Sequence, residues 1–92
     1  MTDQDHHLLL YEYVDDMLAR RGPYREAHLA RIRGERDAGR IVMAGALDDP
    51  PTGAAIVFRG ARPEQIEAFV HADPYVEAGL VTGWRVALWK VV

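Results

Sequence analysis

The order of its short apolar segments is the feature that most restricts how this chain can fold. Glycine and proline separate six segments, each of which has a composition typical either of a strand or of a helix. Segments rich in β-branched, aromatic and aliphatic residues predict strands, and segments that are rich in Ala, Arg and Glu or carry an apolar stripe predict helices. The expected elements are strand 7–14, helix 24–38, strand 41–47, strand 54–58, helix 63–72 and strand 84–91, with turns at 48–53 and 73–79.

This order is β-α-β-β-α-β, the split βαβ arrangement of ferredoxin-like domains. It predicts an α+β fold in which a four-stranded antiparallel sheet carries both helices on one face. A chain of 92 residues is long enough for one domain, spanning 1–92, and too short for two.

The predicted strands are apolar on both faces. Alternate residues of a strand point to opposite sides, so Leu8 and Leu10 face away from Leu9 and Tyr11. Two helices cover only one face of such a sheet, and a large exposed apolar area is unusual on a monomer. The simplest cover for the second face is the same face of another copy, which predicts a homodimer.

Glu12 interrupts the second face of the sheet. It faces the same way as Leu8 and Leu10. Its carboxylate either lines a pocket or pairs with an arginine such as Arg85 across the sheet. We favour the pair.

Composition and missing motifs exclude several classes of function. Eleven basic and fourteen acidic residues give a net charge of −3, which argues against a general binder of nucleic acids or anionic membranes. The sequence contains neither cysteine nor serine, so a thiol nucleophile and a Ser–His–Asp hydrolase are excluded. Without His and carboxylate residues at ligand spacing, we expect no metal and no cofactor. No apolar run approaches the roughly 20 residues of a membrane span, so we expect a soluble, cytoplasmic protein.

His28 and Asp73 are the candidate residues for proton transfer. His28 lies near the start of the first predicted helix, on its core-facing side, where a histidine commonly has only a structural role. Asp73 precedes Pro74, which suits an N-cap, and it also ends the second helix. Because the two helices lie side by side, the carboxylate can meet the imidazole, orient it and stabilise its charged form.

Three further side chains surround this pair in the sequence. Arg25 precedes His28 by three residues and Arg21 by seven. The helix dipole does not favour cations at a helix N-terminus, so these arginines either hold a carboxylate of a ligand or are simply solvated. Tyr75 either closes the pocket or packs against it.

The chain resembles the YCII-related, or YciI-like, family from about His7 to Val92. The resemblance rests on an ordered set of short motifs and not on any single one. These motifs are Arg25 to Leu29 followed by Gly39, then Ala44 to Leu47, Ala68 to Val70, Asp73 to Tyr75, Gly79 to Val81 and Trp89 to Val92.

The resemblance implies a small, ferredoxin-like, dimeric α+β barrel protein. It also implies an active site formed by a His–Asp pair, which corresponds to His28 and Asp73. The chain departs from the family pattern at three places. Ala46 stands where the family usually has proline, Glu35 where it usually has an apolar residue, and Leu88 where it often has proline.

Taken together, these features predict a small, cofactor-independent isomerase or lyase. His28 would act as general acid–base and Asp73 would orient it, with Arg25, Arg21 and Tyr75 contacting a small, anionic, aromatic or lactone-like molecule. Two alternatives remain open, namely a ligand-binding module without catalysis and a structural dimerisation domain. A pocket of roughly several hundred Å³ walled by His28 and Asp73 would favour the enzyme or the binding module, and a well-packed interior without a cleft near His28 would favour the structural domain.

Overall fold

The computed structural model describes residues 5–92 and contains four strands and four helices. The order confirms the predicted succession of the main elements, to which two four-residue helices, α1 and α4, are added. The elements are β1 (His6–Tyr13), α1 (Met17–Arg20), α2 (Gly22–Asp37), β2 (Ile41–Leu47), β3 (Gly53–Arg59), α3 (Pro63–His71), α4 (Pro74–Glu77) and β4 (Val81–Trp89).

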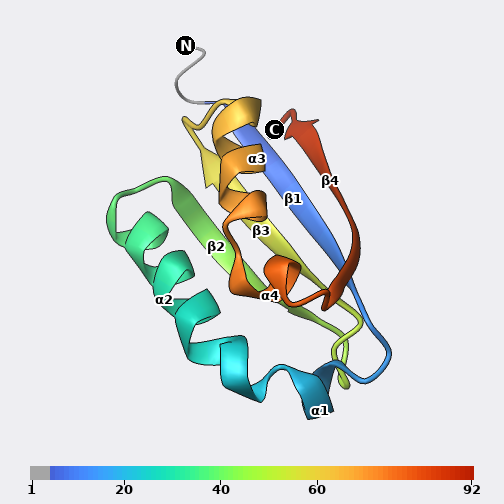
Figure 1. The fold of residues 1–92 in the computed structure, drawn as a ribbon. Coiled ribbons are helices and arrows are strands. Elements are labelled where there is room, and N and C mark those ends of the chain that lie inside the picture. The colour runs from blue at the N-terminus through green and yellow to red at the C-terminus, as the bar shows by residue number, and fades with distance from the viewer. Residues whose placement is uncertain (1–4) are drawn as a thin grey trace.

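The strands form one antiparallel sheet in the order β2-β3-β1-β4, with β1 and β3 in the centre. Figure 1 shows α2, α3 and α4 on the same face of this sheet, where they form the second layer of an α+β fold. The predicted four-stranded antiparallel sheet with its helices on one face is therefore confirmed.

Alternation along the strands determines which side chains enter the core between sheet and helices. On β1, Leu9 and Tyr11 are buried under the helices, while Leu8 and Leu10 lie on the other face and are only partly covered. Phe58 of β3 meets Phe69 of α3 edge to face, with 5.4 Å between ring centroids. The main cluster of buried side chains consists of Leu9, Tyr11, Ile32, Ile41, Ala54, Ile56, Phe58, Ala61, Ile66, Phe69 and Val70.

The face of the sheet away from the helices is called the open face below. Its members follow from the strand register, because residues paired across strands share a face. They are His6, Leu8, Leu10 and Glu12 of β1, Met43, Gly45 and Leu47 of β2, Gly53, Ala55, Val57 and Arg59 of β3, and Gly83, Arg85, Ala87 and Trp89 of β4.

Two elements begin two or more residues before their expected starts, and most other boundaries differ by one residue. Strand β4 begins at Val81 and not at 84, because Gly83 pairs with Glu12 and extends the ladder despite its weak strand propensity. Helix α2 begins at Gly22, with Pro23 in its first turn, and the chain leaves it through Gly39 at a φ of 82°. These caps fix where α2 lies, and therefore where its first two turns present their side chains.

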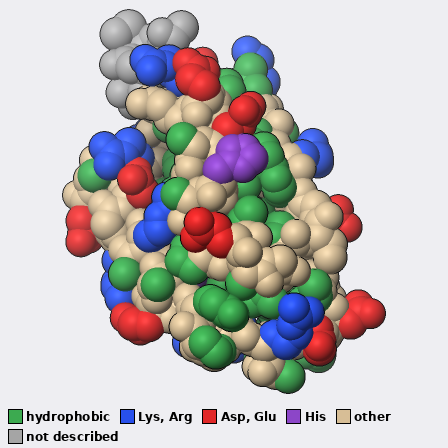
Figure 2. Space-filling model, viewed as in Figure 1, with side chains coloured by type: hydrophobic (Ala, Val, Ile, Leu, Met, Phe, Trp, Pro, Cys, Tyr) green, Lys and Arg blue, Asp and Glu red, His purple; other side chains and the backbone are tan. Residues whose placement is uncertain are grey.

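Basic and acidic side chains are interspersed over the helix-covered face, as Figure 2 shows. No helix within residues 5–92 is long and apolar enough to cross a membrane.

Candidate acid–base site

The carboxylate of Asp73 is the centre of the candidate site. It is 1% exposed and lies between α3 and α4, where it acts as the N-cap of α4. Its Oδ1 accepts the backbone N–H of Tyr75 at 3.0 Å, and its Oδ2 accepts the hydroxyl of Tyr11 at 2.8 Å. The predicted N-cap role is thus confirmed, and the same carboxylate also binds a side chain of the central strand.

His28 of α2 is the third partner of this carboxylate. Its Nδ1 lies 2.9 Å from Oδ1 and 3.1 Å from Oδ2 of Asp73, and His28 is only 7% exposed. A carboxylate accepts hydrogen bonds and does not donate them, so Nδ1 of His28 is the donor. Within residues 5–92, Nε2 has no hydrogen-bond partner. The predicted meeting of His28 and Asp73 is confirmed as geometry.

Tyr75 holds the imidazole from one side. Its ring stacks on that of His28, with 3.9 Å between centroids and 11° between planes, and Tyr13 meets Tyr75 edge to face at 6.0 Å. The hydrogen bonds to Asp73 fix the Nδ1 edge of the imidazole, and the stacking fixes its plane. A ring restrained in this way presents Nε2 in one direction, which is the requirement for directional proton transfer.

A pocket of about 190 Å³ lies beside His28. Arg21, Arg25 and Tyr75 line it, which places all three predicted ligand-contacting residues around the same space. The remaining wall is largely apolar, and half of its residues are alanine or glycine. It consists of Tyr13, Leu29, Ile32, Ala44, Gly45, Ala46, Ala54 and Ile56.

Two basic side chains, Arg21 and Arg25, line the pocket. Neither Arg21 nor Arg25 forms an ion pair with a carboxylate among residues 5–92, whereas Arg20, Arg33, Arg40 and Arg62 do. Burial raises the pKa of Tyr75, and the guanidinium groups of Arg21 and Arg25 oppose that effect. Two guanidinium groups without a protein anion suit a carboxylate or an enolate oxygen.

Two departures from the family pattern lie at different places. Ala46 lines the pocket beside His28, so this substitution affects the candidate site directly. Glu35 lies outside that pocket and forms an ion pair with Arg40 next to a separate hollow between α2 and α3. No group of three or more His, Asp or Glu side chains that could hold a metal ion occurs in the described part of the chain.

Sequence reasoning missed Tyr11 and Tyr13. Both lie on the helix-facing side of β1, where a buried tyrosine hydroxyl needs a hydrogen-bond partner. That requirement was the available signal, but Tyr11 and Asp73 are 62 positions apart, and the sequence does not pair them. Burial, followed by the charge of Asp73 and the hydrogen bond to it, raises the pKa of Tyr11 well above its ordinary value.

The predicted pair between Glu12 and Arg85 is wrong. No ion pair joins them in residues 5–92, because Glu12 lies opposite Gly83 while Arg85 lies opposite Leu10. The carboxylate instead extends over Gly83 and lines a hollow of about 520 Å³ on the open face.

The raised pKa of Tyr11 predicts a loss of stability at high pH. Up to about pH 10 neither the folded nor the unfolded chain ionises this tyrosine. Above that pH the unfolded chain releases the proton and the folded chain keeps it, so the free energy of unfolding falls by up to about 1.4 kcal/mol per pH unit. Urea unfolding across this range should show a shallower fall for Tyr11→Phe than for the wild type.

Tyr24→Phe is the matched control, because Tyr24 is 39% exposed. It should keep the wild-type slope. An unchanged slope in Tyr11→Phe would mean that the hydroxyl is not held by Asp73 in solution.

The sequence profile of the YCII-related domain matches residues 6–90. Protein YciI from Escherichia coli O6:H1 is 36% identical over 86 residues, covering 84% of this chain and 88% of the relative, and Protein YciI from Shigella flexneri matches to the same extent.

A solved structure has the same fold. It is 5-chloro-2-hydroxyhydroquinone dehydrochlorinase (TftG) from Burkholderia phenoliruptrix AC1100, in complex with 2,5-dihydroxybenzoquinone. The TM-score is 0.80, the match covers 95% of both chains, and 24% of the residues are identical. At that level of identity the likeness supports the fold alone.

Proposed function

We propose that this chain, which belongs to the YCII-related domain family, is a small acid–base enzyme acting on a small anionic molecule. His28 is the proposed general acid–base, and Asp73 is the proposed positioning residue. The observation that carries the proposal is the hydrogen bond from Nδ1 of buried His28 to Asp73. His28 lines the pocket, and its Nε2 has no hydrogen-bond partner among residues 5–92. The pocket of about 190 Å³ is smaller than expected from the sequence, and its lining includes His28 but not Asp73. A pocket beside His28 nevertheless favours an enzyme or a binding module over a purely structural domain.

The proposed mechanism begins with removal of a proton from carbon. Because Nδ1 carries a proton for Asp73, Nε2 of neutral His28 has a lone pair, and it takes a proton from a carbon next to a carbonyl group. The electron pair of the broken C–H bond moves into an enolate. Asp73 stabilises the resulting imidazolium. The proton then returns to another carbon, which is isomerisation, or the electron pair expels a leaving group, which is elimination.

Arg21 and Arg25 are the proposed anion-binding residues. Both residues line the pocket and have no carboxylate partner from residues 5–92, so their guanidinium groups are available to a carboxylate of the ligand or to the negative charge that develops on the enolate oxygen. Tyr75 contributes its hydroxyl near the same groups.

The size and the walls of the pocket favour a molecule with one ring. Its volume of about 190 Å³ is below the roughly 300–1,000 Å³ typical of sites for drug-sized ligands. Small side chains of β2 and β3, such as Ala44, Gly45 and Ala54, leave a wall that suits a flat ligand. The name of TftG describes a dehydrochlorination, which is an elimination, and its structure contains a single oxygenated ring. We therefore propose elimination or isomerisation on an oxygenated ring compound.

Deuterium exchange tests the proposed proton transfer without knowledge of the natural substrate. The protein is incubated in D₂O with 2,5-dihydroxybenzoquinone, hydroxybenzoates and small unsaturated lactones, and the loss of C–H signals is followed by ¹H NMR. Exchange that the wild type accelerates and His28→Gln does not would support an enzyme. Compounds that bind, as judged by chemical-shift changes in the protein, but never exchange would favour the ligand-binding module.

We also propose that the protein is a homodimer joined through its open faces, so that two sheets form an α+β barrel. Exposed apolar side chains on that face support this assembly, with Met43 64% exposed and Trp89 47% exposed. Light scattering at micromolar concentration should give twice the 10.3 kDa chain mass. A mass of 10.3 kDa would contradict the dimer.

A further inference from the structure

The open face carries its large and its small side chains at opposite ends. The strand register arranges them in four rows that cross the sheet from β2 to β4. The rows are Leu47, Gly53, Glu12 and Gly83, then Gly45, Ala55, Leu10 and Arg85, then Met43, Val57, Leu8 and Ala87, and finally Arg59, His6 and Trp89 on β3, β1 and β4.

On β3, β1 and β4 the first row is small and acidic, while Leu47 on β2 is its one large apolar side chain. Glu12 lies between two glycines, and its Oε2 comes within 3.3 Å of the point where a Cβ on Gly83 would stand. A Cβ on Gly53 would collide with the backbone oxygen of Tyr11, so only glycine fits there. These positions border the hollow of about 520 Å³. The glycines therefore build the hollow into the backbone, and its lining includes the carboxylate of Glu12 and also Arg85 of the second row.

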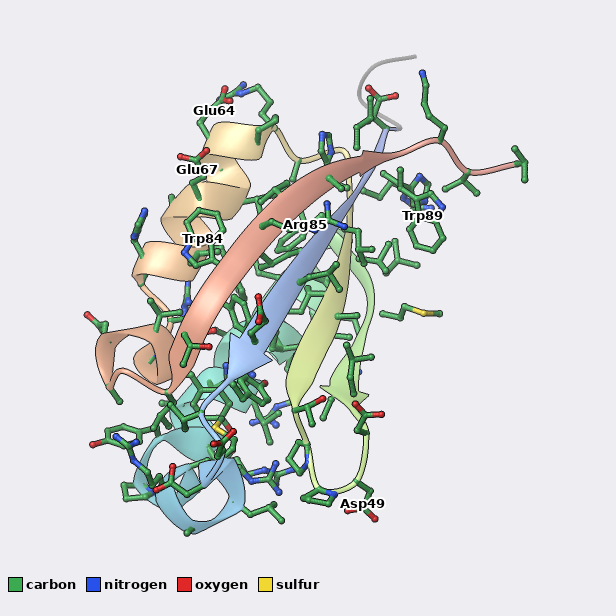
Figure 3. All side chains as sticks on the ribbon, turned by 90° about the vertical axis from the view of Figure 1, so that its right-hand side faces the viewer. Asp49, Glu64, Glu67, Trp84, Arg85 and Trp89 are labelled. Carbon is green, nitrogen blue, oxygen red and sulfur yellow. The ribbon has the colours of Figure 1, made fainter. Side chains whose placement is uncertain are left out.

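The fourth row is large and basic. Arg59 and Trp89 flank His6 at the other end of the face, and Trp89 is half exposed. Figure 3 shows Trp84 on the helix side of β4 and Trp89 on the opposite side. Arg59 forms no ion pair with a carboxylate among residues 5–92. On β3, β1 and β4 the fourth row therefore has the large side chains and the positive charge that the first row lacks.

We propose that two copies pack open face to open face in a reversed register, in which the first row of each copy meets the fourth row of the other. This inference rests on the dimer proposed above and specifies its contacts. The two-fold axis then lies in the interface, across the strands and between the second and third rows. Trp89 enters the partner's hollow beside Gly83. Arg59 comes over the partner's Gly53, from where its guanidinium reaches the carboxylate of Glu12.

The middle rows also fit in this register. Each strand of one copy lies over the same strand of its partner, because the axis runs across the strands. Gly45 then meets Met43, and Ala55 meets Val57, so a small side chain faces a larger one in each case. Leu10 meets Leu8 at the centre of the interface. Aligned sheets in proteins pack about 10 Å apart with interdigitated side chains, which alternating sizes permit.

The other aligned two-fold arrangement also places small side chains against larger ones, such as Gly83 against Leu47 and Ala87 against Met43, but it fits the charges less well. An axis parallel to the strands places β1 of one copy over β3 of the other. Arg59 then faces His6, which brings two basic side chains together, and Glu12 faces Gly53 without a basic partner. Charge complementarity therefore favours the reversed register.

Charge exchange tests this contact, because Glu12 and Arg59 are far apart within one chain. Glu12 pairs with Gly53, which is six residues from Arg59 along β3, so the two lie about 20 Å apart at roughly 3.4 Å per residue. Any coupling between them in the dimer must therefore act between copies. The variants are Glu12→Arg and Arg59→Glu, studied separately and as a 1:1 mixture by sedimentation equilibrium.

Each variant alone should weaken dimerisation, on the order of 10- to 100-fold in Kd, because two equivalent charge contacts lose their opposite charges. The mixture should restore a tight dimer of one copy of each variant. One of its two contacts is then the native pair, and in the other the basic and the acidic side chain have exchanged places. Arg85→Glu is the matched control, with the same charge change on the same face. Mixed with Glu12→Arg, it should give no such recovery.

Three outcomes overturn this proposal. A monomeric wild type would remove the dimer itself. A wild-type dimer that neither Glu12→Arg nor Arg59→Glu weakens would leave the dimer and exclude this register. Recovery with Arg85→Glu as strong as with Arg59→Glu would show a general charge effect instead of a specific contact. Deuterium exchange reports on the proposed chemistry separately, so these outcomes do not depend on it.

Discussion

Replacing His28 by glutamine is expected to lower the rate of enzyme-dependent deuterium exchange by roughly 10²- to 10⁴-fold, the usual contribution of a general acid–base. Glutamine has a comparable length, and its amide N–H can still donate to Asp73, so the buried hydrogen bond has a replacement. It cannot accept and return a proton near neutral pH. The measurement is ¹H NMR of 2,5-dihydroxybenzoquinone in D₂O, with circular dichroism to verify the fold.

His71→Gln is the control for this prediction, since His71 is exposed at the end of α3 and lies outside the pocket. It should keep the wild-type rate. A His28→Gln protein that is folded and still exchanges the ligand at the wild-type rate would exclude His28 as the base.

Two replacements of Asp73, by alanine and by asparagine, are expected to distinguish its contribution to stability from its contribution to catalysis. Alanine removes the acceptor of three buried donors, on Tyr11, His28 and Tyr75, and should lower the free energy of unfolding by about 3–5 kcal/mol. Asparagine caps a helix about as well as aspartate, so Asp73→Asn should lose much less stability. Urea unfolding of both variants measures the difference.

Asp73→Asn should nevertheless lose proton transfer almost as completely as His28→Gln. Its amide group donates towards Nδ1, which favours the tautomer of His28 with the proton on Nε2. That tautomer has no lone pair towards the pocket. ¹⁵N NMR of the imidazole should show the tautomer change together with the loss of exchange. If Asp73→Asn changes neither the tautomer of His28 nor the rate of deuterium exchange, Asp73 serves only as a helix cap.

Much of the fold could be predicted because it depends on local patterns. Alternation in β1 separates Leu9 from Leu10 whatever the rest of the chain does, and Pro23 and Gly39 mark the ends of α2 through backbone sterics. The meeting of His28 and Asp73 could also be predicted, since the topology places α2 and the end of α3 on one face. Helices α1 and α4, with four residues each, are too short to carry a periodic signal.

What could not be predicted depends on register and on distant partners. The predicted pair of Glu12 with Arg85 failed by a displacement of two residues along β4, and a sequence does not determine the register of strands joined by long connections. The hydrogen bond from Tyr11 to Asp73 could not be predicted, because the sequence does not say which polar group lies above the centre of the sheet.

The three hydrogen bonds of Asp73 also have a consequence for folding. They join β1, α2 and α4, so one carboxylate depends on three segments, two of which are far from it in the sequence. The site therefore cannot form in a partly folded intermediate that lacks any of these segments. A local opening that releases α4 removes the acceptor from His28 at the same moment. The fraction of molecules able to transfer a proton therefore depends on cooperative folding of these segments. A mutation that destabilises α4 without touching the pocket would reduce that fraction.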